Sequence, residues 1–266
     1  MMRPYVPVLG KKQSADNARF RHVHKTIATL VPRAYAEWLV MSAATTVRRT
    51  LKEIGAKQVA YAWSGGKDSI ALEVVMERAG VNECLMGMCN LEYPAFLAWV
   101  TRHMPDDLEI VNTGLDLPWL AAHADMLFPK KAATAAKWFK GIQHNAQDRY
   151  FKAHDLDVLI LGRRHADGNY TGKDGLYKNR KGIVRFSPIR HWTHEDVLAV
   201  CHYYRRPMPP VYDWPNGYVC GTGAWPARQW LGTDRNGWAV TYQIDPSIVH
   251  QAAEYLPSAA AYLEEV

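Results

Sequence analysis

A glycine-rich turn between an apolar run and a helical pattern constrains the fold of this chain more than any other feature. The stretch VAYAWSGGKDSIALEVV covers residues 59–75, and residues 59–63 read as a buried strand. From Ser69 onward apolar residues recur at helical spacing, and Gly80 suits a C-terminal cap. Gly65 and Gly66 can adopt backbone angles closed to other residues and let a ligand approach the main chain. In an open parallel sheet ligands bind beyond the carboxyl ends of the strands, which is where this turn would lie.

Strand and helix patterns alternate along most of the chain. Further strand patterns lie at 84–89, 108–111, 158–161 and 183–186. Helix patterns lie at 34–54, 94–103, 118–126, 132–154 and 193–203. This alternation predicts an α/β fold with a mainly parallel sheet that helices cover on both faces.

The two ends of the chain differ from this alternating middle. Residues 1–30 are polar and basic, with Lys11 and Lys12 among the cations, and are expected to form an arm or a loosely packed lead-in. After Arg205 the composition shifts to Pro, Tyr, Trp and Gly, which predicts a tail that wraps the sheet. We therefore expect an N-terminal arm and helix over 1–55, a central domain over 56–225 and a C-terminal tail packed on it over 226–266.

The composition limits where such a protein works. The 266 residues are 48% hydrophobic, enough for one sizeable domain with an extension. Neither a membrane span nor a secretory signal is expected, because the chain lacks a long apolar run and a cleavage-like site near its start. Cys84, Cys89, Cys201 and Cys220 form no closely spaced pair and predict reduced thiols in the cytoplasm. No Cys and His set has the spacing of a metal site. The net charge of +6 suits an anionic ligand or a nucleic acid, or simply a solvated basic surface.

The turn has the features of a phosphate cradle. A helix that begins near Asp68 would point unpaired N–H groups and a partial positive charge at the turn. Ser64 and Ser69 add hydroxyl donors, and Lys67 adds a full charge. The string is not a Walker A loop, because Asp68 follows the lysine where that loop has Ser or Thr. The alternative is a tight turn that happens to contain glycines.

At this point the sequence resembles a known family. SGGKDS at 64–69 is the signature of the PP-loop ATP pyrophosphatases, an adenine nucleotide alpha hydrolase-like superfamily. Within it the chain resembles the phosphoadenosine phosphosulfate (PAPS) reductase family. Three more stretches carry this resemblance: CNLEYPAF at 89–96, LILGRRHADGNY at 159–170 and FSPIRHWTHEDVLAVCHYYRRPMPPVYDWPNGYVCG at 186–221. It implies a Rossmann-like parallel five-stranded sheet with helices on both faces for the central domain.

The resemblance also implies roles for the residues of the turn. The phosphates of ATP, or of an adenylyl sulfate, are expected to bind to Ser64, Gly65, Gly66, Lys67, Asp68 and Ser69. Family members that use ATP cleave it between the α and β phosphates and pass AMP to an acceptor. Such a reaction needs neutralisation of the phosphate charges, which Mg²⁺, Lys67 and arginines would supply. Lys67, Asp68 and Arg164 are therefore the expected catalytic residues.

Two consecutive arginines follow the strand pattern at 158–161. Arg163 and Arg164 would lie at the same edge of the sheet as the turn, where guanidinium groups suit phosphate or sulfate oxygens. Asp167 could hold Mg²⁺ or orient an arginine. The basic, glycine-rich loop that follows is expected to be a mobile lid or else a solvated surface loop, and its cations are Lys173, Lys178, Arg180 and Lys181.

The chain departs from the family pattern at its cysteines. A PAPS reductase attacks sulfur with a cysteine in a C-terminal string, and here no cysteine follows Cys220. Cys220 is the remaining candidate for a redox or sulfur-carrying residue. Cys89 and Asn90 stand where the family usually has an aspartate, which leaves the ribose and adenine contacts open. Trp192, Thr193 and Asp196 match a family pattern and are interpreted as a helix start.

Three functions stay open at this stage. The favoured one is an enzyme that binds ATP–Mg²⁺ and transfers AMP to an acceptor in sulfur-related or modification chemistry. The second is reduction of PAPS or adenylyl sulfate. The third is a non-catalytic nucleotide-binding or nucleic-acid-associated module that acts with a partner, such as an acceptor or a sulfur-donor protein. The basic arm motivates the nucleic acid, as does an aromatic-rich tail that contains Trp214, Trp225, Trp230 and Trp238. An aromatic core that closes the sheet is the preferred interpretation of these tryptophans.

Overall fold

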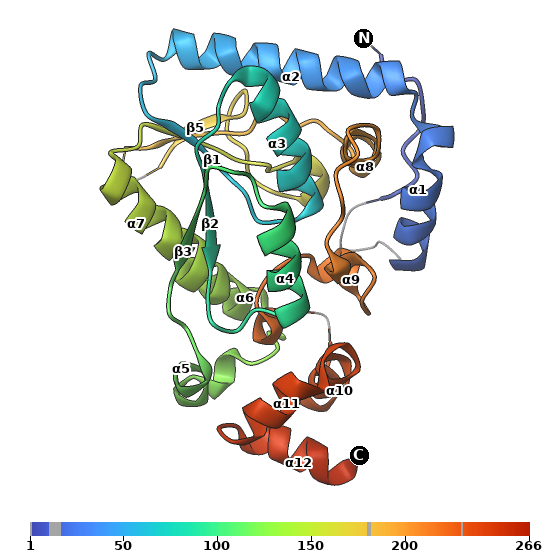
Figure 1. Ribbon diagram of the computed structural model, residues 1–266, viewed down its shortest axis with the longest axis vertical. Helices are drawn as coiled ribbons and strands as arrows, with labels where there is room; N and C mark the ends of the chain where they lie inside the picture. Colours follow the sequence, from blue (N-terminus) through green and yellow to red (C-terminus); the bar gives the residue numbers. More distant parts are fainter. Residues whose placement is uncertain (1, 11–16, 180–181, 230) are drawn as a thin grey trace.

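A six-stranded sheet forms the centre of the computed structural model, with the strand order β3-β2-β1-β4-β6-β5 (Figure 1). The structure describes residues 2–10, 17–179, 182–229 and 231–266. The strands are β1 (Val59–Ala62), β2 (Cys84–Met88), β3 (Leu108–Asn112), β4 (Val158–Ile160), β5 (Leu176–Lys178) and β6 (Val184–Phe186). Five positions discussed above lie outside the described residues: Lys11, Lys12, Arg180, Lys181 and Trp230.

Five of these strands are parallel and coincide with the five strand patterns of the sequence. They pair in the order β3, β2, β1, β4 and β6, and β5 then adds an antiparallel edge. The predicted α/β, Rossmann-like architecture is therefore confirmed. The sheet has one strand more than expected, because a three-residue strand in a basic, glycine-rich loop carries too little periodicity to be recognised.

Side chains alternate across the sheet and build a core on each face. Tyr61, Cys84 and Ile160 belong to the larger core, together with residues of α3, α4 and α8. Leu85 and Leu159 belong to a smaller core that α7 completes. Helices thus cover both faces, and α2 packs outside α3 and α8. The helices of this part are α2 (Arg33–Glu53), α3 (Lys67–Ala79), α4 (Pro94–His103), α5 (Leu117–Ala122), α6 (Ala132–Phe139), α7 (Asn145–His154), α8 (His194–Tyr203) and α9 (Gly217–Cys220).

The helix expected over 132–154 is present with a wider turn in its middle. A π-helical segment, Lys140–His144, joins α6 to α7. Gly87 of β2 lets this helix approach the sheet, because a Cβ there would lie 2.7 Å from the Cβ of Ala146.

The N-terminal region packs more tightly than its composition indicates. Residues 17–30 form α1 (Asn17–Leu30), which buries Phe20, Val23 and Ile27. The ring of Phe20 stacks on that of Tyr218 with 4.1 Å between centroids. The expectation of a loosely packed arm is therefore wrong for 17–30, since three apolar residues at helical spacing are enough to dock a basic helix.

The C-terminal residues form three helices at the lower end of the molecule (Figure 1). They are α10 (Asp234–Ile244), α11 (Pro246–Ala253) and α12 (Pro257–Glu265). Trp238 of α10 packs against Phe128 and Trp225, with ring centroids 5.1 Å and 5.5 Å apart. The tail thus packs on the loop segments around residues 128 and 225, and does not wrap the sheet. Trp225 and Trp238 are buried in an aromatic core, so neither offers a stacking surface.

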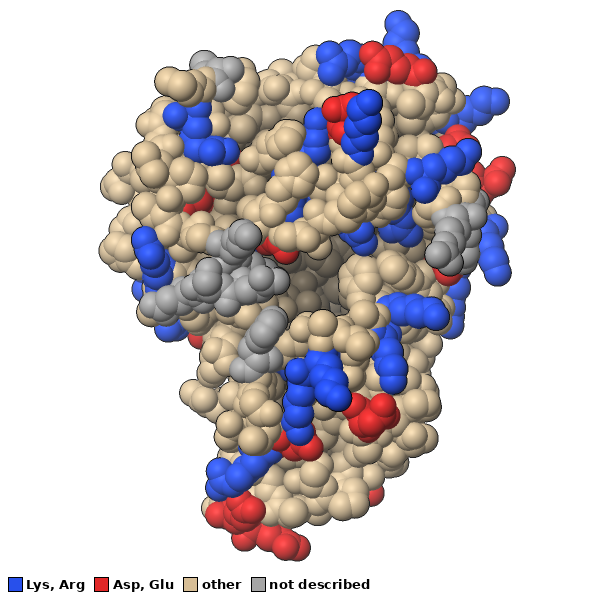
Figure 2. All heavy atoms as spheres, turned by 180° about the vertical axis from the view of Figure 1, so that it is seen from behind, with Lys and Arg blue, Asp and Glu red and all other residues tan. Residues whose placement is uncertain are grey.

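Seen from behind, the surface is hollowed near its centre, between the broad upper part and the narrower lower part (Figure 2). Lys and Arg side chains lie above and below this hollow, and an acidic group lies at its upper rim. Within the described ranges, no helix combines the length and apolar character that a membrane crossing requires.

Candidate functional site

The glycine turn lies at the carboxyl end of β1 and leads directly into α3. Gly65 adopts a left-handed φ of +65°, and an added Cβ would lie 3.1 Å from ring atoms of Phe96 and Trp99. A Cβ on Gly66 would lie 3.3 Å from the hydroxyl oxygens of Ser64 and Thr222. Glycine therefore suits both positions, Gly65 for its backbone angle and both for the limited space around the added Cβ.

The two serines of the turn hold its backbone in shape. Ser69 Oγ accepts a hydrogen bond from Ser64 N at 3.0 Å and donates one to the carbonyl of Gly66 at 2.9 Å. Ser64 Oγ accepts from Gly66 N at 3.4 Å. The main chain at the start of α3 is thus preorganised around the turn, and the exposed Ser64 lies at its outer side.

A buried cluster of charges lies behind the turn. Lys67 Nζ is 2.7 Å from an oxygen of Asp68, and Arg164 Nη2 is 2.7 Å from the other oxygen. Arg164 also contacts Asp167 at 2.9 Å. Lys67 and Arg164 are 2% and 0% exposed, so neither cation faces solvent. Burial by itself lowers the pKa of Arg164, but attraction by Asp68 and Asp167 outweighs it, and this guanidinium stays charged.

The two arginines that follow β4 therefore have different surroundings. Arg164 lies beneath the turn, which does not fit the expectation that it binds phosphate directly, and Asp167 orients it. Arg163 is partly exposed, and its Nη1 donates to the hydroxyl of Tyr177 at 3.0 Å. Its guanidinium carbon is 5.9 Å from the ring centroid of Phe139. Consecutive residues in extended backbone alternate in direction, which separates the two guanidinium groups.

Aromatic residues from α8 and from the segment after it complete the wall of the site, and sequence reasoning missed them. The hydroxyl of Tyr212 accepts a hydrogen bond from Lys67 N at 2.8 Å. Lys67 Nζ lies 5.7 Å from the ring centroid of Tyr218. His194 Nδ1 is 3.1 Å from Arg164 Nη2. All three residues lie in the stretch 186–221 that resembles the family, but this resemblance does not say which side chains reach the turn, and tyrosines there are equally compatible with a core.

The helix start expected at Thr193 is confirmed. Thr193 caps α8, and its hydroxyl and the carboxylate of Asp196 form a reciprocal capping box.

Three of the four cysteines are buried packing residues. Burial raises the pKa of Cys84 to about 11 and that of Cys201 to about 12, and it also raises the pKa of Cys89. These thiols stay protonated near neutral pH and are poor nucleophiles. Cys220 is partly exposed on α9, two residues before Thr222, and its Sγ donates to the carbonyl of Gln229 at 3.4 Å. Cys201 Sγ lies closer to the turn, 3.7 Å from the carbonyl oxygen of Lys67, but it is buried, so Cys220 is the more accessible thiol.

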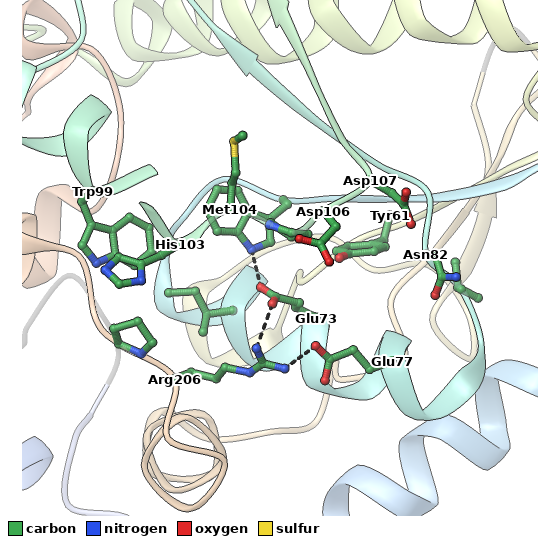
Figure 3. A pocket seen from close by; sticks show the side chains of 15 residues that line it. Tyr61, Glu73, Glu77, Asn82, Trp99, His103, Met104, Asp106, Asp107 and Arg206 are labelled. Atoms are coloured by element: carbon green, nitrogen blue, oxygen red, sulfur yellow. Dashed lines mark hydrogen bonds and ion pairs between the residues drawn. The ribbon is translucent and has the colours of Figure 1, made fainter. Parts of the chain in front are cut away.

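A pocket of about 460 Å³ opens between α3 and α4, and Trp63 and Trp99 are among its lining residues. Trp63 Nε1 donates to Glu73 at 2.7 Å, and Arg206 pairs with Glu73 and Glu77, as the dashed lines in Figure 3 show. Asp106 also lines this pocket. The acidic lining of this pocket disfavours binding of a nucleotide. We therefore assign Glu73 a supporting role, because it fixes Trp63, the residue directly before Ser64 of the turn.

Comparison with known proteins places the chain in a family. The family model described as the phosphoadenosine phosphosulfate reductase domain matches residues 58–219. The chain belongs to the PAPS reductase family. The resemblance carried by the four sequence stretches is therefore confirmed. No curated protein sequence matches this PAPS reductase family member.

Solved structures with similar folds are distant in sequence. Phosphoadenylyl-sulfate reductase from Candida auris, in a phosphate complex, is 14% identical with a TM-score of 0.49, over 80% of this chain and 97% of that chain. FMN adenylyltransferase from Candida glabrata is 11% identical with a TM-score of 0.48, over 74% and 67%. NMN synthetase from Francisella tularensis is 14% identical with a TM-score of 0.49, over 86% and 93%. These likenesses are too remote to carry an argument about activity.

Proposed function

We propose that this protein binds ATP–Mg²⁺ at residues 64–69 and transfers AMP from it to an acceptor. The observation that carries the proposal is the left-handed turn at Gly65, which leads at the carboxyl edge of a parallel sheet into the first residues of α3. The N-terminal end of a 13-residue helix is a favourable place for phosphate oxygens. The family match over 58–219 supports the same location.

The charged cluster behind the turn holds the turn in position, and its positive and negative charges nearly cancel. Lys67 and Arg164 are balanced by Asp68 and Asp167, within 2.7–2.9 Å of one another. We therefore assign Asp68, Arg164 and the equally buried Lys67 to fixing the start of α3, and Lys67 adds the positive charge nearest to the proposed phosphates. Arg163 is the more accessible arginine for an anionic ligand. Ser64, Gly65, Gly66 and Ser69 would surround the phosphates, and Ser69 Oγ, which bonds to Ser64 N and to the carbonyl of Gly66, would keep the turn in shape.

Mg²⁺ would enter with the nucleotide. Among the described residues no group of three or more His, Cys, Asp or Glu side chains is arranged to hold a metal ion. We therefore propose that the Mg²⁺ ion would be coordinated mainly by the phosphate oxygens of ATP. In the reaction, a bond forms between the acceptor and the α-phosphorus as the bond from that phosphorus to the bridging oxygen breaks, and Mg²⁺–pyrophosphate leaves.

A calorimetric titration tests the proposal. We expect ATP–Mg²⁺ to bind the wild-type protein and to bind Lys67→Ala at least tenfold more weakly, while Lys57→Ala, an exposed lysine away from the turn, behaves as wild type. Pyrophosphate release should then appear with one member of an acceptor panel of oxyanions, nucleobases and carbonyl compounds. Failure of ATP to bind, or equal binding by both variants, would contradict the proposal. Circular dichroism checks that Lys67→Ala is folded.

Reduction of PAPS or adenylyl sulfate is the second candidate, and the position of Cys220 favours it. This thiol lies two residues before Thr222, which approaches Gly66 of the turn. Its thiolate would attack the sulfonate sulfur, the bond to the nucleotide phosphate oxygen would break, and a dithiol reductant such as thioredoxin would release sulfite and become oxidised. Sulfite formation with thioredoxin that Cys220→Ser abolishes would support this candidate over adenylyl transfer.

A further inference from the structure

Arg185 occupies a position where the fold calls for an apolar residue. It lies on β6, beside Leu159 of β4 and opposite Tyr177 of β5. Leu159 and Ile183, which share its face of the sheet, belong to the small apolar core under α7. Arg185 is only 5% exposed, its guanidinium carbon lies 5.8 Å from the ring centroid of Phe151, and its side chain also interacts with Tyr177, but its Nη1 has no hydrogen-bond partner among the described residues. A buried guanidinium that aromatic groups satisfy only in part is costly, so this position favours an anionic partner.

Arg185 lines a groove of about 1060 Å³ between the α6–α7 helix and the β5–β6 edge of the sheet. Three further cations line it, namely Lys140, Arg149 and Lys152, and all three are exposed. Among the described lining residues the one carboxylate is Asp148. The groove exists because α7 covers β2 and β3 on this face and leaves β6 and β5 partly uncovered. Its lining is therefore cationic along two elements.

The field in this groove is positive enough to affect a neighbouring histidine. His144 also lines the groove, and burial lowers its pKa. Arg185 and Arg163 lower the pKa of His144 further by charge repulsion.

Exposed aromatic rings accompany these cations. Phe139 is 40% exposed and lines the groove with Tyr177. Tyr170 is 70% exposed, and its ring centroid is 5.3 Å from that of Tyr177. Arg163 contacts both Tyr177 and Phe139, because it donates a hydrogen bond to the hydroxyl of Tyr177 and its guanidinium lies over the ring of Phe139. Flat exposed rings beside cations form a surface on which nucleobases stack.

We propose that this groove, lined by Lys140, Arg149, Lys152, Arg185, Phe139 and Tyr177, binds single-stranded nucleic acid. The cations are distributed along the α6–α7 helix and β6, so their spacing suits the successive phosphates of a nucleic-acid strand better than it suits one small anion. The exposed rings favour a nucleic acid over a phosphopeptide. Arg163 contacts Phe139 and Tyr177 of this groove, and the next residue, Arg164, pairs with Asp68 of the nucleotide turn, so the bound strand would lie near that turn. The strand would then be the acceptor of AMP, an extension that rests on the proposed function.

Fluorescence anisotropy with labelled 12-nucleotide single strands of RNA and of DNA, without ATP, tests the binding. We expect the double variant Lys140→Gln/Lys152→Gln to bind about 20-fold more weakly at 0.1 M salt and to reduce the slope of log K against log salt by about 1.4, because each phosphate contact on a single strand contributes about 0.7. The control is Lys52→Gln/Lys57→Gln, which removes the same charge from exposed lysines outside the groove. This control should bind as wild type. Phe139→Ala should weaken binding about tenfold with an unchanged slope, because stacking releases no counterions.

Three results would overturn the inference. They are no binding by the wild type, equal weakening by the groove and control pairs, and equally tight binding of a phosphopeptide or of inorganic polyphosphate. The acceptor role has its own readout, which is pyrophosphate release from ATP stimulated by the strand. If the strand binds and release is not stimulated, the groove assignment stands and the acceptor role is wrong. If ATP itself fails to bind, the proposed function fails while the binding result still stands.

Discussion

Replacing Gly65 by alanine separates the role of the turn from a general effect on stability. Gly65 has a φ of +65° and Gly55, at the end of α2, has a φ of +64°, so alanine is strained about equally at both. That strain costs on the order of 1–2 kcal/mol. At Gly55 nothing lies within 4 Å of the added Cβ, whereas at Gly65 the Cβ would lie 3.1 Å from the rings of Phe96 and Trp99. Gly65→Ala therefore carries an extra displacement of the turn, and an overpacked contact typically adds about 1–3 kcal/mol.

Two measurements on both variants test this reasoning. Urea unfolding should show a loss of about 1–2 kcal/mol for Gly55→Ala and about 2–5 kcal/mol for Gly65→Ala, from the ranges of the two effects. Calorimetry should show that Gly55→Ala binds ATP–Mg²⁺ like the wild type, while Gly65→Ala binds it at least tenfold more weakly. Wild-type affinity in a folded Gly65→Ala protein would refute the view that this backbone holds the phosphates.

Three further substitutions test other parts of the structure. Burial raises the pKa of Glu92 to about 7, so the folded protein holds a proton that the unfolded chain loses near pH 4.5. The free energy of unfolding should therefore fall by about 3 kcal/mol as the pH rises through this window. Urea unfolding at pH 5 and at pH 8 should show this fall, and Glu92→Gln should remove it. Gly237→Ala should destabilise the protein by about 1–3 kcal/mol, because its Cβ would lie 2.2 Å from the ring of Phe128, and calorimetry should show unchanged ATP affinity. Asp68→Asn should reduce the free energy of unfolding by about 3 kcal/mol and lower the thermal unfolding midpoint, because it removes a carboxylate from the fully buried Arg164. An unchanged midpoint would contradict the structural role of this pair.

The parallel strands and the glycine turn could be predicted because their signals are local. Residues 59–63 form a short apolar run, and the helix after Gly66 has its apolar residues three and four apart. These patterns need no knowledge of the rest of the chain. The edge strand Leu176–Lys178 escaped prediction for the opposite reason, since it exists only through its pairing with Val184–Phe186. The docking of α1 escaped because its partner, Tyr218, lies far along the chain.

By itself the sequence determined the α/β class, the five parallel strands and the place of the glycine turn, because periodicity and glycine turns act over a few residues. Only the tertiary structure decided that Arg164 is buried beneath Asp68 while Arg163 reaches Tyr177 and Phe139. It also decided that the hydroxyl of Tyr212 accepts a hydrogen bond from the N–H of Lys67, 145 residues earlier in the chain, and that Arg185 lines a cationic groove. Whether a charged side chain binds a ligand or stabilises the fold depends on its exposure and its partners, and both are set by contacts between residues that are distant along the chain.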